Sequence, residues 1–599
     1  MDEQIQVGAQ GRAAMTADPK ITGDETVSHR PRQRRTRSLT LGEEFDPPQS
    51  SATQPRAARH VRRGASVAAI GIPTALTGLH AAVYGRWIVD DAAISFAYAR
   101  SIAKGLGPVL QPGDPLVEGY SNPAWLALFV LGRWLGIFDH GSWFGIPDYV
   151  AFPKLLALLC CAILFGAYYA IASTLTVWPV TVTVVAGAIV AAIPSFTIWA
   201  FSGLENALYA ATVGWIAAVL VRATTRGNLL LAKTAIASGL LAALAALIRP
   251  DGLIYVLAYP LVVVTLAKGP RLRACTVNLL AFNVPMGAFL LWRFMTFGQL
   301  LPNTAFAKGQ GLPGLLSIAR PFELIVYSGC APALLGLALV VYALRTRSGK
   351  KTGLLVLLLT FGLAILDYAL LRNDWMGQRR FATPIWALAA ILISVAFALV
   401  FAEATQRNRR VIALAAAVTA IVMVAVSGYE AILFRHNPTV PVCAVASYAG
   451  WTVNAYASAL NLRNAVIVTP DVGGSAMVSD LKVVDLAGLG DAEIAELWRR
   501  GDMSGVRTHI LDARPEFIEI HDAWSKKTGL TEDPRLTLDY SPITQTSPTD
   551  GLWVRRDLAG ALAALGTRPV STRSRPLLPS KPYQLVNPLE SCGPLTARG

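Results

Sequence analysis

The stretch FATPIWALAAILISVAFALVFA (residues 381–402) contains no charged side chain. An α-helix of this length can cross the roughly 30 Å of hydrocarbon in a bilayer. Similar apolar segments recur along the chain and decide its fold; they cover residues 65–86, 122–138, 152–176, 179–200, 203–222, 229–248, 252–268, 274–297, 321–345, 353–371, 380–402 and 410–433. The sequence therefore predicts a polytopic α-helical membrane protein.

The composition of the 599 residues supports this class. Hydrophobic residues make up 53% of the chain and charged residues 15%, whereas soluble domains carry about 25% charged residues. The net charge is +15, but most Lys and Arg lie beside apolar segments, where membrane proteins place them to set topology. We therefore expect membrane lipid around the chain and no nucleic-acid partner.

Four basic clusters define the expected topology: residues 222–226, 268–273, 345–351 and 407–410. The positive-inside rule puts them in the cytoplasm with the N-terminus, and the C-terminus then lies outside. Twelve spans would leave both termini on one side, so one segment does not cross. Residues 122–138 form the shortest segment and contain Arg133. We expect an interfacial or re-entrant helix there and about 11 transmembrane helices in total.

Three regions follow from the patterning. Residues 1–64 are basic and poor in large apolar residues, which predicts a disordered cytoplasmic tail. Residues 65–433 form the transmembrane domain, with a first outer loop at about 87–150. Residues 434–599 alternate strand-like and helix-like runs, which indicates a small extracytoplasmic α/β domain. Cys443 and Cys592 lie near its two ends, and an oxidising compartment favours a disulfide between them.

Two adjacent carboxylates, Asp90 and Asp91, follow the first apolar segment in the stretch DDAAISFAYAR (residues 90–100). Carboxylates at a membrane boundary are costly to bury, so they mark a candidate site. Neighbouring residues of a helix diverge by about 100°, which suggests different tasks. One can remove a proton from a sugar hydroxyl while the other positions a cation or a hydroxyl. A helix N-cap before Ala92 is an equally open interpretation.

The remaining outer connections carry further polar and charged residues. Arginines there oppose the positive-inside bias, and their planar guanidinium matches phosphate. We expect donor-phosphate binding by Arg249, Lys308, Arg379 and Arg380. We expect binding of sugar or acceptor hydroxyls by Glu118, Glu205, Asp251, Asn303, Asp374 and Trp375. Simpler roles stay open: a helix cap for Glu205, a local pair for Arg249 with Asp251, and the aromatic belt for Trp375.

Seven motifs in order resemble a bacterial glycosyltransferase family. They are DDAAISFAYAR (90–100), VEGYSNPAW (117–125), SGLEN (202–206), RPDG (249–252), LLPNTAFAK (300–308), DWMGQRRF (374–381) and VVDLAGLGDAEIA (483–495). The family belongs to the GT-C superfamily, and its best-known member is arabinofuranosyltransferase B of mycobacteria and corynebacteria. The resemblance covers about residues 66–500.

The resemblance implies transfer of a sugar from a polyprenyl-phosphate donor at the periplasmic face of the cytoplasmic membrane. It maps the catalytic base onto Asp90 or Asp91; we expect Asp90 as base and Asp91 as helper, with the reverse order open. It implies decaprenyl-phosphoryl-arabinofuranose as donor and a β-(1→2) linkage to arabinan termini of arabinogalactan or lipoarabinomannan. A different lipid-linked sugar is the alternative, followed by a flippase for such lipids. No metal motif occurs, and a divalent cation bridging Asp91 and phosphate is left open.

Overall fold

The computed structural model describes residues 56–308, 315–345, 349–372, 374–566, 587 and 589–595. The basic tail expected at residues 1–64 lies outside the described residues up to residue 55. From Arg56 onward the chain belongs to helix α1 (Arg56–Ala82).

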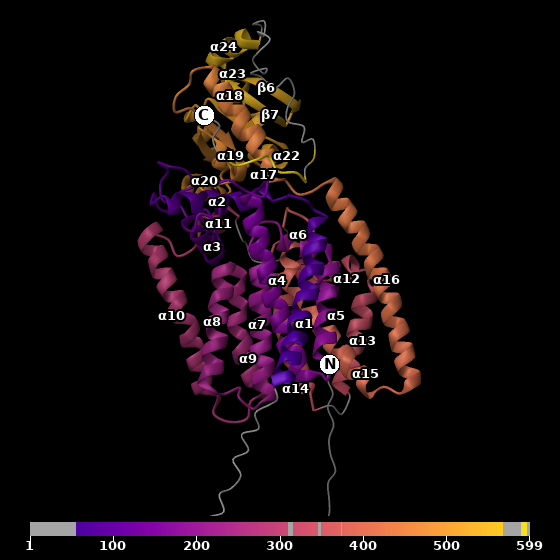
Figure 1. The fold of residues 1–599 in the computed structure, drawn as a ribbon. Coiled ribbons are helices and arrows are strands. Elements are labelled where there is room, and N and C mark those ends of the chain that lie inside the picture. The colour runs from indigo at the N-terminus through magenta and orange to yellow at the C-terminus, as the bar shows by residue number, and fades with distance from the viewer. Residues whose placement is uncertain are drawn as a thin grey trace, which may run out of the picture. The chain divides into compact units, whose positions relative to one another are not determined.

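The described residues form a helical membrane bundle (Figure 1). Seven helices are long and apolar enough to cross a bilayer: Gly64–Ala82 of α1, α4 (Asp148–Leu175), α7 (Asn206–Thr225), α10 (Arg271–Phe297), α14 (Lys351–Leu370), α15 (Thr383–Glu403) with the preceding 3₁₀ turn η3 (Arg380–Ala382), and α16 (Gln406–His436). These lengths follow from uncharged runs whose backbone must satisfy its own hydrogen bonds in lipid.

Two further pairs of helices are apolar enough together to cross, but each is bent sharply at a short break, as in a broken span or a re-entrant loop. The first pair is α5 (Pro179–Ala192) with α6 (Pro194–Ala200), bent by 82° at a proline. The second is Ser317–Tyr327, which includes part of η2 (Leu315–Ala319) and α12 (Phe322–Tyr327), with α13 (Ala331–Arg345), bent by 105°. Two shorter apolar helices are α8 (Ala232–Ile248) and Pro250–Leu266, made of η1 (Pro250–Leu257) and α9 (Ala258–Leu266). By length and composition, the described residues thus supply seven spans, or up to nine if each bent pair is one span, against the eleven expected.

Short elements cover one end of the bundle (Figure 1). They are α2 (Asp90–Ala103), α3 (Pro123–Trp134), the hairpin of β1 (Ser142–Trp143) and β2 (Ile146–Pro147), and α11 (Asn303–Ala307). Helix α3 has 12 residues, a length of about 18 Å at 1.5 Å per residue. It is too short to cross a bilayer, as expected for the segment at 122–138.

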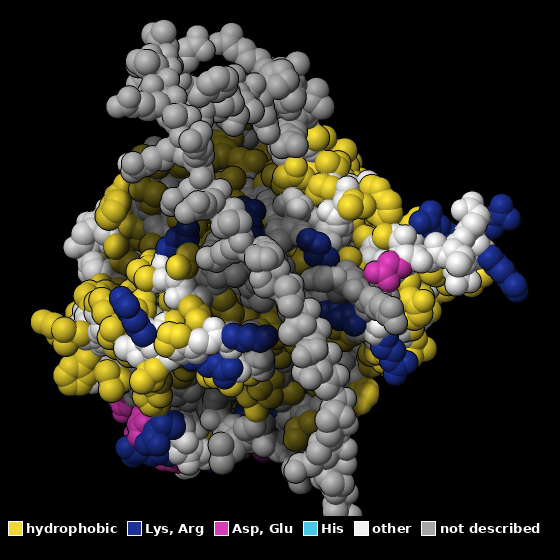
Figure 2. All heavy atoms as spheres, turned by 90° about the horizontal axis from the view of Figure 1, so that it is seen from below, with side chains coloured by type: hydrophobic (Ala, Val, Ile, Leu, Met, Phe, Trp, Pro, Cys, Tyr) yellow, Lys and Arg dark blue, Asp and Glu magenta, His cyan; other side chains and the backbone are white. Residues whose placement is uncertain are grey.

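Seen from the opposite end of the bundle, Lys and Arg side chains lie among apolar ones, with few Asp or Glu side chains (Figure 2). The helices that begin there start in basic segments, such as α10 at Arg271 and α14 at Lys351. Helix α7 ends there at its C-cap, Arg226. The basic clusters and the short covering elements thus occupy opposite ends of the bundle.

The chain after α16 forms the predicted α/β region. It begins with α17 (Val442–Val445), the π-helical turn η4 (Ala446–Trp451) and α18 (Thr452–Ala459). The sheet has the order β4-β3-β5-β7-β6, with β3 parallel to β4 and β5, and β7 antiparallel to β5 and β6. Its strands are β3 (Val466–Thr469), β4 (Lys482–Asp485), β5 (Phe517–Ile520), β6 (Tyr540–Ser547) and β7 (Asp550–Arg555).

Helices surround this sheet: α19 (Val472–Val478), α20 (Ala492–Arg500), α21 (Met503–Asp512), α22 (Asp522–Thr528), η5 (Leu530–Glu532), α23 (Pro534–Asp539) and α24 (Arg556–Gly566). Helix α20 begins where the sequence indicates, because the Asp491 side chain caps it by accepting from the backbone N–H groups of Glu493 and Ile494, both at 3.0 Å. The structure joins Cys443 and Cys592 in a disulfide, with Cα atoms 5.5 Å apart.

Candidate active site

Asp90 and Asp91 begin helix α2 but face different surroundings. Asp90 is buried, and its carboxylate accepts hydrogen bonds from the backbone N–H groups of Gly473 (3.1 Å) and Gly474 (2.7 Å) in α19. Asp91 is half-buried and lines a cavity of about 340 Å³. The divergence expected from helical geometry therefore separates the two carboxylates, and only Asp91 faces this cavity.

We call this space the Asp91 cavity. It lies where α2, the first outer loop, the starts of α7 and η1, helix α11 and the start of η3 meet. Its polar and charged lining consists of Asp91, Ser95, Tyr120, Ser121, Asn122, Glu205, Arg249, Asp251, Thr304, Lys308 and Arg380. Six residues predicted for the site, Asp91, Glu205, Arg249, Asp251, Lys308 and Arg380, thus share one cavity although the sequence spreads them from residue 91 to residue 380.

A buried hydrogen-bond network forms one wall of the cavity. Arg249 donates through Nη1 to Glu205 at 2.9 Å and through Nε to both carboxylate oxygens of Asp251 at 3.0 and 3.1 Å. Glu205 also accepts from the Asn122 amide at 2.9 Å, and the Asn122 carbonyl accepts from the Ser95 hydroxyl at 3.2 Å. This wall is rigid and paired, so its carboxylates are poor candidates for a base.

Arg380 is similarly engaged. Its Nε lies 2.7 Å from an Asp374 carboxylate oxygen, and its guanidinium lies 4.9 Å from the Phe381 ring centroid. These contacts fix the orientation of a cation that lines the Asp91 cavity. Asp374 itself does not line that cavity.

Asp91 and Lys308 differ from this paired wall. Neither side chain forms a hydrogen bond or an ion pair with any residue that the structure describes. Lys308 is the C-cap of α11. Its side chain is exposed and lines the Asp91 cavity. The cavity therefore presents one acid and one amine whose polar atoms are available to a ligand.

The electrostatics of the cavity distinguish its carboxylates. Burial raises the pKa of Asp91 more than the positive charges of Lys308 and Arg380 lower it. Burial also opposes ionisation of Glu205, but Arg249, Arg380 and the Asn122 hydrogen bond together lower its pKa below the ordinary value. A carboxylate with a raised pKa accepts a proton more readily at neutral pH. Asp91 is thus the stronger base of the two.

The pKa of Lys308 is lowered by burial, which outweighs the opposite effect of the Asp91 charge. An amine in such a site binds an anion strongly because the anion supplies the missing counter-charge. The arrangement can hold an anionic group at Lys308 while Asp91 accepts a proton nearby.

A second, smaller cavity of about 230 Å³ adjoins the first and shares Arg380 and Phe381 with it. It contains the predicted residues Asp374 and Arg379. The Arg379 Nε lies 3.6 Å from a Glu323 carboxylate oxygen, and its guanidinium lies 5.2 Å from the Tyr327 ring centroid. Arg379 therefore does not line the Asp91 cavity but lies next to it.

The structure places three other predicted residues away from the Asp91 cavity. Glu118 pairs with Arg293 at 2.7 Å, and burial raises its pKa to about 7 although Arg293 lowers it. Asn303 donates to the carbonyl oxygens of Gly488 (2.8 Å), Leu489 (3.0 Å) and Asp491 (3.2 Å). Trp375 has 63% of its surface exposed. Glu118 and Asn303 fix the loops around the cavity.

Sequence reasoning missed the partners that shape the site. Ser95 is buried on α2 one turn after Asp91, a spacing of four residues that marks a shared helix face. The glycine pair Gly473–Gly474 reads as a plain strand-to-helix turn, and nothing in the sequence indicates its contact with Asp90. Among the described residues, no group of three or more His, Cys, Asp or Glu side chains could hold a metal ion.

The fold is similar to that of a solved structure. ArnT from Cupriavidus metallidurans superposes with a TM-score of 0.52 at 14% sequence identity, over 83% of this chain and 98% of ArnT. The chain has a fold of the GT-C type, with seven to nine candidate apolar spans among the described residues.

Other similarities are weaker. The archaeal oligosaccharyltransferase AglB from Archaeoglobus fulgidus matches with a TM-score of 0.45 and 11% identity, over 74% of this chain and 68% of AglB. The arabinofuranosyltransferase AftD from Mycobacteria matches with a TM-score of 0.46 and 14% identity, over 81% of this chain and 40% of AftD. A domain family of unknown function, DUF8728, matches residues 445–565. A search of curated proteins gives no significant match.

Proposed function

We propose that the protein transfers a sugar from a polyprenyl-phosphate donor to a glycan acceptor, and that the reaction takes place in the Asp91 cavity. The observation that carries this proposal is the pairing pattern. Asp91 and Lys308 have no partner among the described residues, while Arg249, Glu205 and Asp251 around them are paired. A base for a hydroxyl and a cation for a phosphate are the two groups that such a transfer requires.

In this reaction, Asp91 takes the proton from the acceptor hydroxyl as its oxygen attacks the anomeric carbon of the donor sugar. The bond between that carbon and the phosphate oxygen breaks, and its electron pair leaves with the polyprenyl phosphate. A phosphate monoester has its second pKa near 6, so this leaving group departs as an anion without needing a proton. The proton that Asp91 has taken is later released to water.

The cations stabilise the charge that develops on the leaving phosphate. Lys308 donates to a phosphate oxygen directly, because its ammonium has no other described partner. Arg380 is held by Asp374 at 2.7 Å and by the Phe381 ring, so it supplies a fixed charge rather than a mobile one. Arg249 orients the carboxylates of Glu205 and Asp251. Those carboxylates hold the hydroxyl groups of the sugar.

For the sugar, we propose arabinofuranose from decaprenyl-phosphoryl-arabinofuranose, added in β-(1→2) linkage to arabinan termini of arabinogalactan or lipoarabinomannan. The ordered motifs support this choice, since all seven contribute residues to the lining of the Asp91 cavity. The GT-C fold shared with ArnT accommodates a different lipid-linked sugar equally well, which makes the donor sugar the first variable to test.

We place the Asp91 cavity at the outer face of the cytoplasmic membrane and the N-terminus in the cytoplasm. The support is the charge distribution: basic clusters begin the helices at the opposite end of the bundle (Figure 2). By the positive-inside rule, that end is cytoplasmic.

The test is a transfer assay with the full-length protein in liposomes, a panel of synthetic polyprenyl-phospho-sugars and an arabinan oligosaccharide acceptor. We expect a product one sugar longer by mass spectrometry, made best from the arabinofuranose donor and lost in the Asp91→Asn variant. Transfer of another sugar would correct the donor. Movement of the lipid across the bilayer without transfer, or full activity of an Asp90→Asn, Asp91→Asn double variant, would overturn the proposal.

A further inference from the structure

The first turn of α2 is held by three segments that are distant in sequence. The backbone N–H of Val89 donates to Ser202 at 3.1 Å, and the N–H of Asp90 donates to Val440 in the linker after α16 at 3.0 Å. The Asp90 carboxylate completes the attachment by accepting from Gly473 and Gly474 of α19. Both carboxylate oxygens are therefore engaged by backbone donors of the α/β region.

The two glycines allow this contact. A Cβ atom on Gly473 would lie 2.0 Å from the Asp90 carbonyl oxygen and 2.7 Å from Asp90 Oδ2, far inside van der Waals contact. A Cβ atom on Gly474 would lie 2.5 Å from the Val442 carbonyl oxygen and from the Ala446 nitrogen. Only glycine lets the backbone of α19 approach both α2 and the α17–η4 segment this closely.

Asp90 is itself badly placed to react. It is 4% exposed, does not line the Asp91 cavity, and each of its carboxylate oxygens already accepts a backbone hydrogen bond. Its position next to Asp91 gives it a different use. A carboxylate locked at residue 90 fixes the backbone of the residue that follows, and the direction of the Asp91 side chain with it.

We propose that Asp90 is a positioning residue, through which the glycine pair of the α/β region holds Asp91 in its reactive orientation. This inference rests on the proposed function, because it assigns the base to Asp91. It makes the α/β region part of the catalytic scaffold rather than an appended module. Misplacement of a reacting group by about 1 Å can cost about 100-fold in rate, so a loosened Asp90 lowers kcat without removing any substrate contact.

The disulfide strengthens the same attachment. The linker that binds Asp90 continues through Val442, whose N–H donates to Ile88 at 3.0 Å, into Cys443, which is joined to Cys592. The disulfide beside the linker limits how far Val440, which accepts from the Asp90 N–H, can move. The attachment of α2 thus combines hydrogen bonds to Asp90 with a cross-link one residue beyond Val442.

A double-mutant cycle tests the proposal in the transfer assay. We expect Asp90→Asn to lower kcat about 10- to 100-fold with KM for donor and acceptor unchanged within about twofold. In an Asp91→Asn background, the same substitution should cause no further loss, because its effect passes through Asp91. An unchanged kcat in Asp90→Asn, or an equal further loss in the Asp91→Asn background, would overturn the proposal.

Asp502→Asn is the matched control. The Asp502 carboxylate also accepts a hydrogen bond from a glycine N–H, that of Gly505 at 2.7 Å, but Asp502 is the N-cap of α21 and does not line the Asp91 cavity. We expect this variant to keep the wild-type kcat. A loss in Asp502→Asn as large as in Asp90→Asn would show that any disturbed cap in the region lowers activity, and would overturn the specific role of Asp90.

Hydrogen exchange tests the attachment without relying on activity or on the folding of the Asp90→Asn variant. In the wild-type protein and in Asp91→Asn, the amides of Gly473 and Gly474 should exchange at least about 100-fold more slowly than an unstructured peptide. Rapid exchange of both would overturn the proposal even if transfer is observed. Protected amides in a protein that transfers no sugar would instead contradict the proposed function and leave the attachment intact.

Discussion

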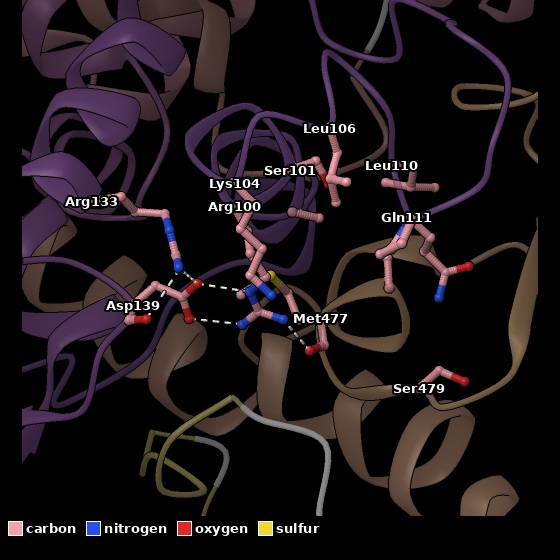
Figure 3. A pocket seen from close by; sticks show the side chains of 13 residues that line it. Arg100, Ser101, Lys104, Leu106, Leu110, Gln111, Arg133, Asp139, Met477 and Ser479 are labelled. Carbon is pink, nitrogen blue, oxygen red and sulfur yellow. Dashed lines mark hydrogen bonds and ion pairs between the residues drawn. The ribbon is translucent and has the colours of Figure 1, made fainter.

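The Asp91 cavity has a counterpart at the other end of α2. This second space, the Arg100 cavity, has a volume of about 350 Å³ and is lined by Arg100, Lys104, Arg133 and Asp139 among others (Figure 3). It matches the Asp91 cavity in size and in its arginines. The difference lies in the acid, because Asp139 sits between two arginines while Asp91 has no described partner.

The acid of the Arg100 cavity is fully engaged by arginines. Arg100 donates from Nε and NH2 to the two Asp139 carboxylate oxygens, both at 2.7 Å, and its remaining donors reach the carbonyl oxygens of Met477 and Leu595 at 2.6 Å. Arg133 also pairs with Asp139. The comparison teaches that volume and charge do not identify a reactive site in this molecule; an acid and a cation left without partners do.

The largest expected effect separates the two acids by activity. Asp91→Asn should lower kcat by about 10²- to 10⁴-fold, the usual contribution of a general base, while Asp139→Asn should leave the kcat of the folded protein unchanged. Rates at saturating donor and acceptor, normalised to folded protein, give the comparison. A similar loss in both variants would remove the distinction between the cavities.

The free energy of unfolding should change more in Asp139→Asn than in Asp91→Asn, the reverse of the order expected for kcat. Asp139→Asn leaves two half-buried arginines without the carboxylate that bridges them, so we expect it to lower the free energy of unfolding by about 1.5–3 kcal/mol. The surface pair of Asp512 with Arg535, at 3.4 Å, offers a control, since exposed pairs contribute about 0–1 kcal/mol. Denaturation in detergent measures both variants. A stability loss for Asp139→Asn no larger than for Asp512→Asn would contradict the structural role.

The free cation of the Asp91 cavity should affect donor binding and pH dependence. We expect Lys308→Gln to weaken donor binding about 10- to 100-fold through loss of a charged hydrogen bond.

Because Asp91 must be ionised, the wild-type rate should rise with pH through its raised pKa, and it should fall again as Lys308 loses its proton at its lowered pKa. Lys308→Arg should keep the acidic limb and abolish the alkaline one. An unchanged alkaline limb in Lys308→Arg would exclude Lys308 as its source.

The smallest effect is expected at Trp375, which the sequence suggests as a sugar-stacking residue. It is 63% exposed and lines neither the Asp91 cavity nor its neighbour. Trp375→Ala should change KM and kcat by less than about twofold, as expected for a residue outside the site. A tenfold rise in the acceptor KM would show that the acceptor extends beyond the Asp91 cavity to this residue.

Much of the fold could be predicted because it follows from local properties. Uncharged runs long enough to cross a bilayer indicate the spans, and the alternating runs after residue 434 indicate the α/β region. Arg249, Lys308 and Arg380, which the motifs single out, line one cavity, since polar residues between spans gather at a bundle end. These features depend on periodicity and on the cost of burying charge, both of which the sequence displays.

The roles of individual residues could not be predicted, because they depend on distant partners. Asp90 is distinguished from Asp91 by Gly473, which is 383 positions away. The sequence suggests that Glu118 and Asn303 bind a substrate. In the structure, Glu118 instead pairs with Arg293, and Asn303 donates to carbonyl oxygens within residues 488–491. Whether a charged group is free or paired is a tertiary property, and that property separates the Asp91 cavity from the Arg100 cavity.

The most direct test of the central claim is a structure of the protein with a phosphonate analogue of decaprenyl-phosphoryl-arabinofuranose. The account predicts the phosphonate within hydrogen-bond distance of Lys308 Nζ and the anomeric carbon beside the Asp91 carboxylate. A phosphonate bound in the Arg100 cavity, or a sugar that does not approach Asp91, would contradict it.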